Sequence, residues 1–162
     1  MEKLTISQAQ KLSSPNPFAL VCVPNGEKTN VAAFSWWTYV SNKPPMLLFC
    51  ASKKGFTGEC IKKESRFVLC LPDESLANAA YKCGTVSGRS VDKPTEFGIE
   101  LVELGGLMVV AQSKVVFVCK LESVAEGSDH FIYIAEIVDI YGSPEIKHLM
   151  ATEGYAALCP AK

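Results

Sequence analysis

Short apolar runs separated by turn residues constrain the fold of this chain more than any other feature of its sequence. The runs Phe18–Val23, Met46–Ala51 and Phe67–Leu71 are almost wholly apolar, and each has about the length of one strand. The first run is followed by Asn25-Gly26, a dipeptide that favours a tight hairpin turn. We therefore predict a second, longer strand from about Thr29 to Tyr39 that returns antiparallel to the first.

Two later strands, predicted at Lys114–Glu122 and His130–Tyr141, alternate between apolar and polar residues. In the first of them one face carries Val115, Phe117, Cys119 and Leu121, and the other carries Lys114, Lys120 and Glu122. This period of two residues is typical of a half-buried strand in an antiparallel sheet. The segment Gly127-Ser128-Asp129 supplies a turn between the two strands, so they are also predicted to form a hairpin.

Helices are predicted to be few and short. Their expected ranges are 5–13, 57–64 and 75–82, with Ser52 or Thr57 near the start of the second and Ser75 as a candidate cap of the third. Residues 84–98 are rich in glycine, hydroxyl and charged side chains and are predicted to form a loop. Because long strands and hairpins outnumber helices, the sequence predicts a mostly β protein, an antiparallel barrel with short peripheral helices.

Length and charge limit the possible classes of protein. A chain of 162 residues suits a single domain over residues 1–162, with residues 142–162 expected to form a C-terminal arm. A formal net charge of -1 lacks the basic excess of a general nucleic-acid binder. No signal peptide is recognisable, and no apolar run reaches the ~18 residues of a membrane span. We therefore expect neither nucleic acid nor membrane as a partner.

The seven cysteines are an unusual number for such a chain. They cannot all pair internally, and none stands in a C-x-x-C motif, so no zinc ribbon or thioredoxin-like motif is indicated. The two histidines are too far apart for a helical metal pair, and no metal site is expected. Four cysteines lie inside apolar runs, where a free thiol behaves as a small buried hydrophobe: Cys22, Cys50, Cys70 and Cys119. A nucleophilic Cys–His pair stays open as an alternative, and free thiols favour a reducing, cytoplasmic location.

Three polar clusters lie at the ends of predicted strands. The first, residues 30–41, holds both tryptophans of the chain, Trp36 and Trp37. Because neighbouring strand residues face opposite ways, one indole is expected to face inward and the other a ligand, a partner or a second subunit. The alternative is that both tryptophans are ordinary core aromatics.

The other two clusters carry positive charge. Ser52-Lys53-Lys54-Gly55-Phe56-Thr57 leaves a strand and enters a helix, an arrangement that suits a phosphate group. In residues 87–93 a glycine permits close backbone approach, and Arg89 or Lys93 can meet an anion. Taken alone, each cluster is more often a solvated surface loop than an anion site. His130 opens the last predicted strand, and a lone histidine is more often structural than catalytic.

No Gly-x-Gly-x-x-Gly or Gly-x-x-x-x-Gly-Lys-Ser/Thr motif is present, so Rossmann-type or P-loop nucleotide binding is not indicated. Taken together and in order, however, the motifs of residues 15–141 resemble the flavin reductase-like family, the split-barrel FMN-binding proteins that include flavoredoxin. The motifs are Asn16-Pro-Phe-Ala-Leu-Val, Asn30-Val-Ala-Ala-Phe-Ser-Trp, Ser41-Asn-Lys-Pro-Pro, Ser52-Lys-Lys-Gly-Phe-Thr, Arg66-Phe-Val, Ser87-Gly-Arg-Ser-Val-Asp-Lys and Gly127-Ser-Asp-His. One departure is Pro94, where the family commonly has phenylalanine.

The resemblance implies a six-stranded Greek-key split barrel, non-covalent FMN, a homodimer with flavin near the subunit interface, and NADH or NADPH as a possible electron donor. By motif position, Ser52, Lys53 and Thr57 would hold the phosphate, with Lys54 nearby, and Lys93 would approach the pyrimidine side of the ring. His130, the catalytic candidate, would lie near the nicotinamide face. The remaining expected cofactor contacts are Asn30, Ser35, Trp36, Trp37, Thr38, Cys50, Ala51, Ser87, Gly88 and Arg89.

Three functions are compatible with these features. The first is an NAD(P)H:flavin oxidoreductase that passes hydride from nicotinamide to flavin. The second is an FMN electron carrier that exchanges electrons with a redox protein partner such as rubredoxin or an iron–sulfur protein. The third is a barrel that binds a different small ligand and transfers no electrons.

Overall fold

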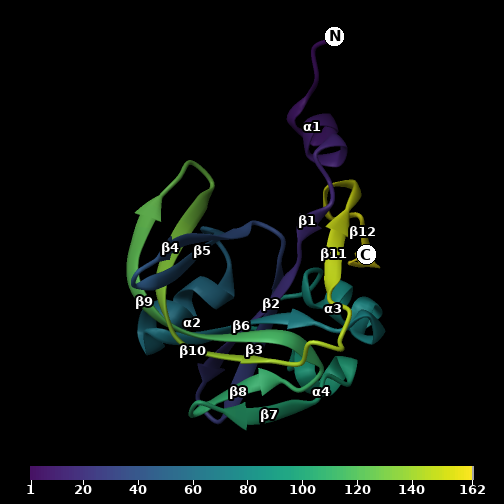
Figure 1. The fold of residues 1–162 in the computed structure, drawn as a ribbon. Coiled ribbons are helices and arrows are strands. Elements are labelled where there is room, and N and C mark those ends of the chain that lie inside the picture. Colours follow the sequence, from purple (N-terminus) through teal and green to yellow (C-terminus); the bar gives the residue numbers. More distant parts are fainter. Residues whose placement is uncertain (162) are drawn as a thin grey trace.

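A curved seven-stranded antiparallel sheet dominates the computed structural model, which describes residues 1–161 (Figure 1). In spatial order its strands are β3 (Lys28–Phe34), β2 (Ala19–Asn25), β6 (Arg66–Pro72), β9 (Ser113–Glu126), β10 (His130–Gly142), β5 (Pro45–Ser52) and β4 (Trp37–Asn42). The β2–β3 and β9–β10 hairpins form as the turn residues predict. The predicted mostly β split barrel is confirmed, although its main sheet has seven strands rather than six.

The barrel closes between two strands that follow each other in the chain. β3 and β4 are consecutive in sequence yet occupy opposite edges of the sheet, and only Ser35 and Trp36 separate them. The predicted continuous strand from Thr29 to Tyr39 is therefore wrong. It breaks because the first half pairs with β2 and the second with β5, so the backbone must bend between them. The Cys50 N–H donates to the Trp36 carbonyl oxygen at 2.9 Å and fixes the bend against β5.

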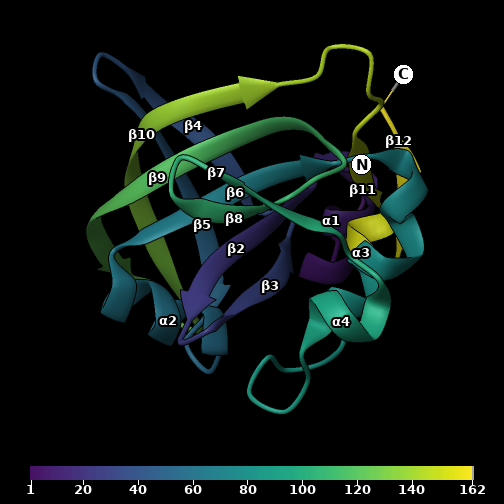
Figure 2. The same cartoon turned by 90° about the horizontal axis from the view of Figure 1, so that it is seen from below.

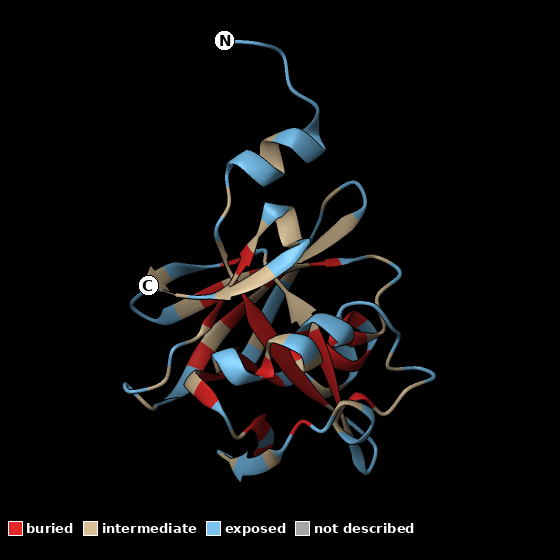
Figure 3. Ribbon diagram, turned by 90° about the vertical axis from the view of Figure 1, so that its right-hand side faces the viewer, coloured by how far each residue is buried: buried red, intermediate tan, exposed pale blue. Residues whose placement is uncertain are grey.

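Three central strands are buried on both faces. In β9, Phe117 and Cys119 face the barrel interior, as the alternation predicts. Val116 and Val118 on the opposite face are also buried, in a second core under the helices and the C-terminal hairpin. β2 and β6 divide their residues between the two cores in the same way, which explains why their sequences are continuous apolar runs rather than alternating ones. Figure 3 shows this buried centre in red.

The helices lie outside the barrel. They are α1 (Ile6–Leu12), α2 (Phe56–Glu64), the 3-10 turn η1 (Glu74–Leu76), α3 (Ala77–Cys83) and α4 (Lys93–Phe97). Asp73, not the expected Ser75, caps η1, since its carboxylate accepts the Ser75 N–H at 2.9 Å. The prediction of an uninterrupted loop over 84–98 is wrong at α4, where Pro94 fits the first turn. Figure 2 shows α3 and α4 side by side, away from α2.

Two small sheets complete the described chain. β7 (Leu101–Leu104) and β8 (Leu107–Val110) form a hairpin that the sequence analysis did not predict. Within residues 142–162, β11 (Leu149–Thr152) and β12 (Ala157–Pro160) flank the turn η2 (Glu153–Tyr155), and β11 also pairs with β1 (Asn16–Pro17). Leu149 and Ala151 are buried in the second core. Lys162, the last residue of the expected arm, lies outside the described residues.

In the described part of the chain, no helix is both long and apolar enough to cross a membrane.

Candidate functional site

A continuous groove runs along the seam where the barrel closes. It consists of two adjoining cavities of about 300 and about 280 Å³. Residues from β3, β5 and the end of α3 line both cavities: Ala33, Phe34, Ala51, Ser52 and Gly84. We call this hollow the seam groove. One of its ends lies at the start of α2 and the other at the bend between β3 and β4.

The α2 end of the seam groove is rich in hydrogen-bond donors. Ser52, Lys54 and Thr57 line it, and α2 begins after Gly55, which has no side chain to cap the helix. The first-turn N–H groups of α2 are therefore not satisfied by a capping side chain, and the helix dipole adds partial positive charge there. Such a helix start is suited to an anion, phosphate in particular.

Asn30 fixes the hydroxyl of Thr57 at this end. The buried Asn30 Nδ2 donates to Thr57 Oγ1 at 3.0 Å, so the Thr57 hydroxyl keeps its own proton to donate elsewhere. The Oδ1 atom of Asn30 is buried and has no hydrogen-bond partner among residues 1–161. Gly88 packs directly on it, because a Cβ at position 88 would lie 1.8 Å from that oxygen. Glycine is thus required here for the close approach of the loop.

Aromatic side chains and a histidine line the opposite end. The rings of Trp36 and His130 lie 5.0 Å apart between centroids, and Cys50 lines the same cavity. His130 reaches this place because it pairs in register with Ser52 across β10 and β5. Its Nδ1 donates to Asp129 Oδ1 at 2.8 Å, and this hydrogen bond lowers the pKa of the Asp129 carboxyl. The other ring nitrogen, Nε2, takes no part in this hydrogen bond.

The two tryptophans divide as expected. Trp37 is buried against Phe117 and Tyr39, whereas Trp36 is 45% exposed and lines the groove. The expectation that one indole faces inward and the other outward is therefore confirmed, although Trp36 belongs to the bend rather than to a strand.

Lys93 is the one buried lysine of the described chain and lies against the groove wall. Its Nζ donates to the Cys83 carbonyl oxygen at 2.6 Å. Burial lowers the pKa of Lys93, because desolvation disfavours the ammonium form. Burial also raises the pKa of the neighbouring Cys83 thiol to about 11, and Cys83 lines the groove as well.

Most residues expected from the sequence come together here. Those that line the seam groove are Ser35, Trp36, Cys50, Ala51, Ser52, Lys54, Thr57, Ser87, Gly88, Lys93 and His130. Asn30 and Arg89 line a cavity next to it. Trp37, Thr38 and Lys53 line none of these cavities. The Lys53 ammonium instead forms an ion pair with Glu126 and lies 5.4 Å from the centre of the Phe131 ring.

Sequence reasoning missed several residues of the groove, chiefly Phe56, Cys83 and Tyr155. Phe56 lies inside the quoted phosphate motif, and its apolar side chain carried no signal of its own. Tyr155 comes from the C-terminal segment, which the resemblance did not cover. It reaches the groove through a turn in which Glu153, Gly154 and Tyr155 all have positive φ, a conformation that the sequence does not announce.

A comparison with protein families identifies this arrangement. The model of the family described as "Flavin reductase like domain" matches residues 12–158. The chain therefore belongs to the flavin reductase-like family, and the match includes most of the C-terminal segment.

Solved structures share the fold. A flavoredoxin from Methanosarcina acetivorans superposes with a TM-score of 0.86 at 21% identity, covering 100% of this chain and 92% of that one. An NADH:FAD oxidoreductase from Streptomyces globisporus superposes with a TM-score of 0.85 at 18% identity, covering 100% and 96%. At these identities the likeness establishes the fold alone.

Among characterised relatives, the reductase subunit HsaB of a flavin-dependent monooxygenase from Mycobacterium tuberculosis is 25% identical over 112 residues, 67% of this chain. This match spans 56% of the HsaB sequence. YddH of Escherichia coli is 27% identical over 61% of this chain, and that match spans 53% of the YddH sequence. The chain thus covers about half the length of these curated relatives.

The burial of Lys93 predicts a pH dependence of stability. The pKa of Lys93 is lowered in the folded chain and ordinary in the unfolded chain. At pH values between these two pKa values the unfolded state binds more protons, so the free energy of unfolding increases as the pH rises. We expect the stability of the wild type relative to Lys93→Met to increase from pH 7 to pH 9.5 in urea titrations. Titration of Cys83 and the other thiols contributes to both variants and largely cancels in the difference. A pH-independent difference would contradict the burial argument.

Proposed function

We propose that this protein is an NAD(P)H:flavin oxidoreductase that binds FMN non-covalently in the seam groove. One observation carries the proposal: a single groove joins an uncapped helix start with phosphate-binding chemistry to a cleft lined by Trp36 and His130. A phosphate-tailed aromatic ligand needs both ends at once. Membership of the flavin reductase-like family supports the same class of ligand.

The α2 end would hold the phosphate. The first-turn N–H groups, the hydroxyls of Ser52 and Thr57 and the ammonium of Lys54 are donors that a phosphate dianion requires. Asn30 would contribute indirectly, by orienting Thr57. Because the Asn30 amide donates to the Thr57 hydroxyl oxygen, the hydroxyl proton of Thr57 stays available to the ligand. The Lys53 side chain, paired with Glu126, would contribute charge near the site rather than a direct contact.

The middle and far end would hold the ring system. Ala33, Phe34 and Ala51 form an apolar wall that excludes water from one side of the ligand. Lys93, which also lines the groove, would place positive charge near the ring.

Trp36 and His130 would orient the nicotinamide of the donor, and no side chain of the groove has to act as an acid or base. Bound flavin supplies the redox chemistry by accepting hydride from the nicotinamide. The seven free thiols support placing this activity in the reducing cytoplasm.

Anaerobic titration tests the reductase. Purified protein is mixed with FMN, and the flavin absorbance near its oxidised maximum is followed after NADH or NADPH is added. We expect FMN to bind and to bleach within seconds with at least one nucleotide. A protein that takes up no FMN contradicts both flavin functions. If bound FMN stays oxidised for minutes with both nucleotides but dithionite reduces it, the electron-carrier function replaces the reductase.

We also propose that the protein is a homodimer. Large apolar side chains are exposed on β4 and on the end of β10: Tyr39, Val40, Val138, Ile140 and Tyr141. Tyr39 packs on Phe117, which is the register partner of Ile140, so Tyr39 and Ile140 are exposed on the same face of the sheet. Exposed apolar side chains of this size are best covered by another protein surface, and a second copy of the chain is the occupant that needs no other component.

Sedimentation equilibrium tests the dimer. The wild type should have twice the mass of its 17.6 kDa chain. Val138→Lys places a charge among these exposed apolar side chains of β10 and should shift the protein toward monomer. Val102→Lys, at a similarly exposed valine on β7, is the matched control and should remain dimeric. A monomeric wild type, or a Val138→Lys variant that dimerises as before, would contradict the proposed interface.

A further inference from the structure

Lys93 carries a buried positive charge that the rest of the described chain does not neutralise. The residue is 4% exposed, and among residues 1–161 its ammonium belongs to no ion pair. Within the same residues the ammonium makes one hydrogen bond, to the Cys83 carbonyl oxygen at 2.6 Å. An ammonium has three N–H donors, so two of them have no protein partner. Buried lysines are rarely left in this state, because an unpaired charge that is removed from water costs free energy.

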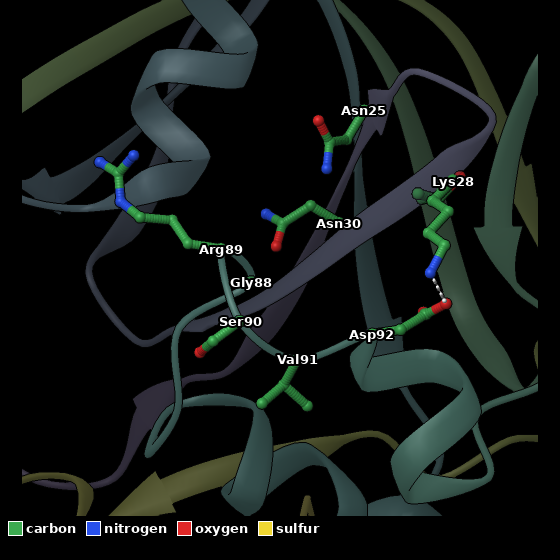
Figure 4. Close-up of a pocket in the computed structure, with 9 residues that line it drawn as sticks. Asn25, Lys28, Asn30, Gly88, Arg89, Ser90, Val91 and Asp92 are labelled. Carbon is green, nitrogen blue, oxygen red and sulfur yellow. Dashed lines mark ion pairs between the residues drawn. The ribbon is translucent and has the colours of Figure 1, made fainter.

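The side chains around Lys93 do not supply the missing negative charge. Asp92, the residue before it, pairs with Lys28 Nζ at 3.1 Å (Figure 4). Glu96, in the same short helix α4, is exposed. Burial raises the pKa of the Cys83 thiol to about 11, so that thiol is uncharged at pH 7. The ammonium therefore faces the carbonyl end of α3, which offers partial rather than full negative charge.

The position of Lys93 in its helix is also unfavourable. It is the first residue of α4, where the helix dipole favours acidic and not basic side chains. Two local costs thus coincide at this residue, an unpaired buried cation and a cation at a helix start. Natural chains tend to break such local rules at functional sites, so we looked for a ligand that would supply the counter-charge.

The seam groove is where such a ligand would meet Lys93. Lys93 and Cys83 line the same cavity of about 300 Å³ as the start of α2, yet α4 lies away from α2 (Figure 2). A ligand in this groove therefore meets two separate positive features. The start of α2 suits a phosphate, and Lys93 suits a second negative charge elsewhere on the same molecule.

The redox states of flavin differ in this second charge. The ring of oxidised flavin is neutral, whereas the ring of two-electron-reduced flavin is an anion at neutral pH. With the phosphate on α2, the reduced form would supply a counter-charge for Lys93 and the oxidised form would not.

We propose that Lys93 makes the seam groove selective for reduced flavin, so that the protein retains its flavin once it is reduced instead of releasing it. The proposal rests on the proposed flavin site, because it needs the phosphate at the start of α2. By thermodynamic linkage, a site that binds the reduced form more tightly also raises the reduction potential of the bound flavin. The same preference is therefore measurable in two independent ways.

Binding of the two redox forms tests the proposal. The dissociation constants of oxidised FMN and, under anaerobic conditions, of dithionite-reduced FMN are measured for the wild type, Lys93→Met and Lys54→Met. We expect the wild type to bind reduced FMN at least about tenfold more tightly than oxidised FMN, because a close opposite charge favours an anion by that factor or more. The reduction potential of the bound flavin should then lie at least ~30 mV above that of free FMN, the two-electron equivalent of tenfold.

In Lys93→Met the ratio should fall to about one, with the affinity for oxidised FMN no weaker than in the wild type. This variant removes an unpaired buried charge, so in urea titrations at pH 7 it should be at least as stable as the wild type. Lys54→Met is the matched control, because Lys54 lines the phosphate end of the groove. It should weaken the binding of both redox forms by the same factor and leave their ratio unchanged.

Equal affinities of the wild type for the two forms would overturn the proposal. Equal weakening of both forms in Lys93→Met would overturn it as well, because Lys93 would then bind the phosphate rather than the ring. In either case the flavin site itself would stand. A wild type that binds neither form would instead contradict the proposed function.

Discussion

The bend at Ser35 and Trp36 is the constraint on which the rest of the molecule depends. β3 and β4 are joined by these two residues and yet form opposite edges of one sheet, so the sheet has to curl until its edges meet. The Cys50 N–H bond to the Trp36 carbonyl secures the meeting point on β5. A barrel closed by a two-residue bend cannot continue its ladder of hydrogen bonds through the bend, and the seam groove opens where the ladder is interrupted.

The seam brings together side chains that are far apart in the chain. β5 delivers Cys50 and Ser52, β10 delivers His130 in register with Ser52, and the bend delivers Trp36. α2 starts directly after β5, so its first turn faces the same groove. Polar groups without a partner also lie in the groove, at the uncapped start of α2 and at the Tyr155 hydroxyl. The start of α2 is the one of the two that suits an anionic ligand, because its N–H groups and the helix dipole favour negative charge.

Local patterns predicted much of this architecture. Apolar runs and turn residues located β2, β5, β6, β9 and β10, and the motif order located most of the groove-lining residues. The break after Phe34 was not predictable, because most of residues 31–40 are β-branched or aromatic and favour an extended backbone, and the two halves differ in their pairing partners. Tertiary contacts likewise decided between two adjacent lysines. Lys54 lines the groove, whereas Lys53 is drawn to Glu126 on a strand more than seventy residues later in the chain.

Hydrogen exchange of the α2 amides with and without FMN tests the central claim most directly. The amides of Phe56, Thr57 and Gly58 lack helical partners in the ligand-free chain and should exchange quickly. On FMN binding they should slow by about tenfold or more, as charge-assisted hydrogen bonds form to the phosphate, and the amide of Trp36 should gain protection as well. Protection confined to another part of the protein, with the first turn of α2 unchanged, would contradict the seam groove as the flavin site.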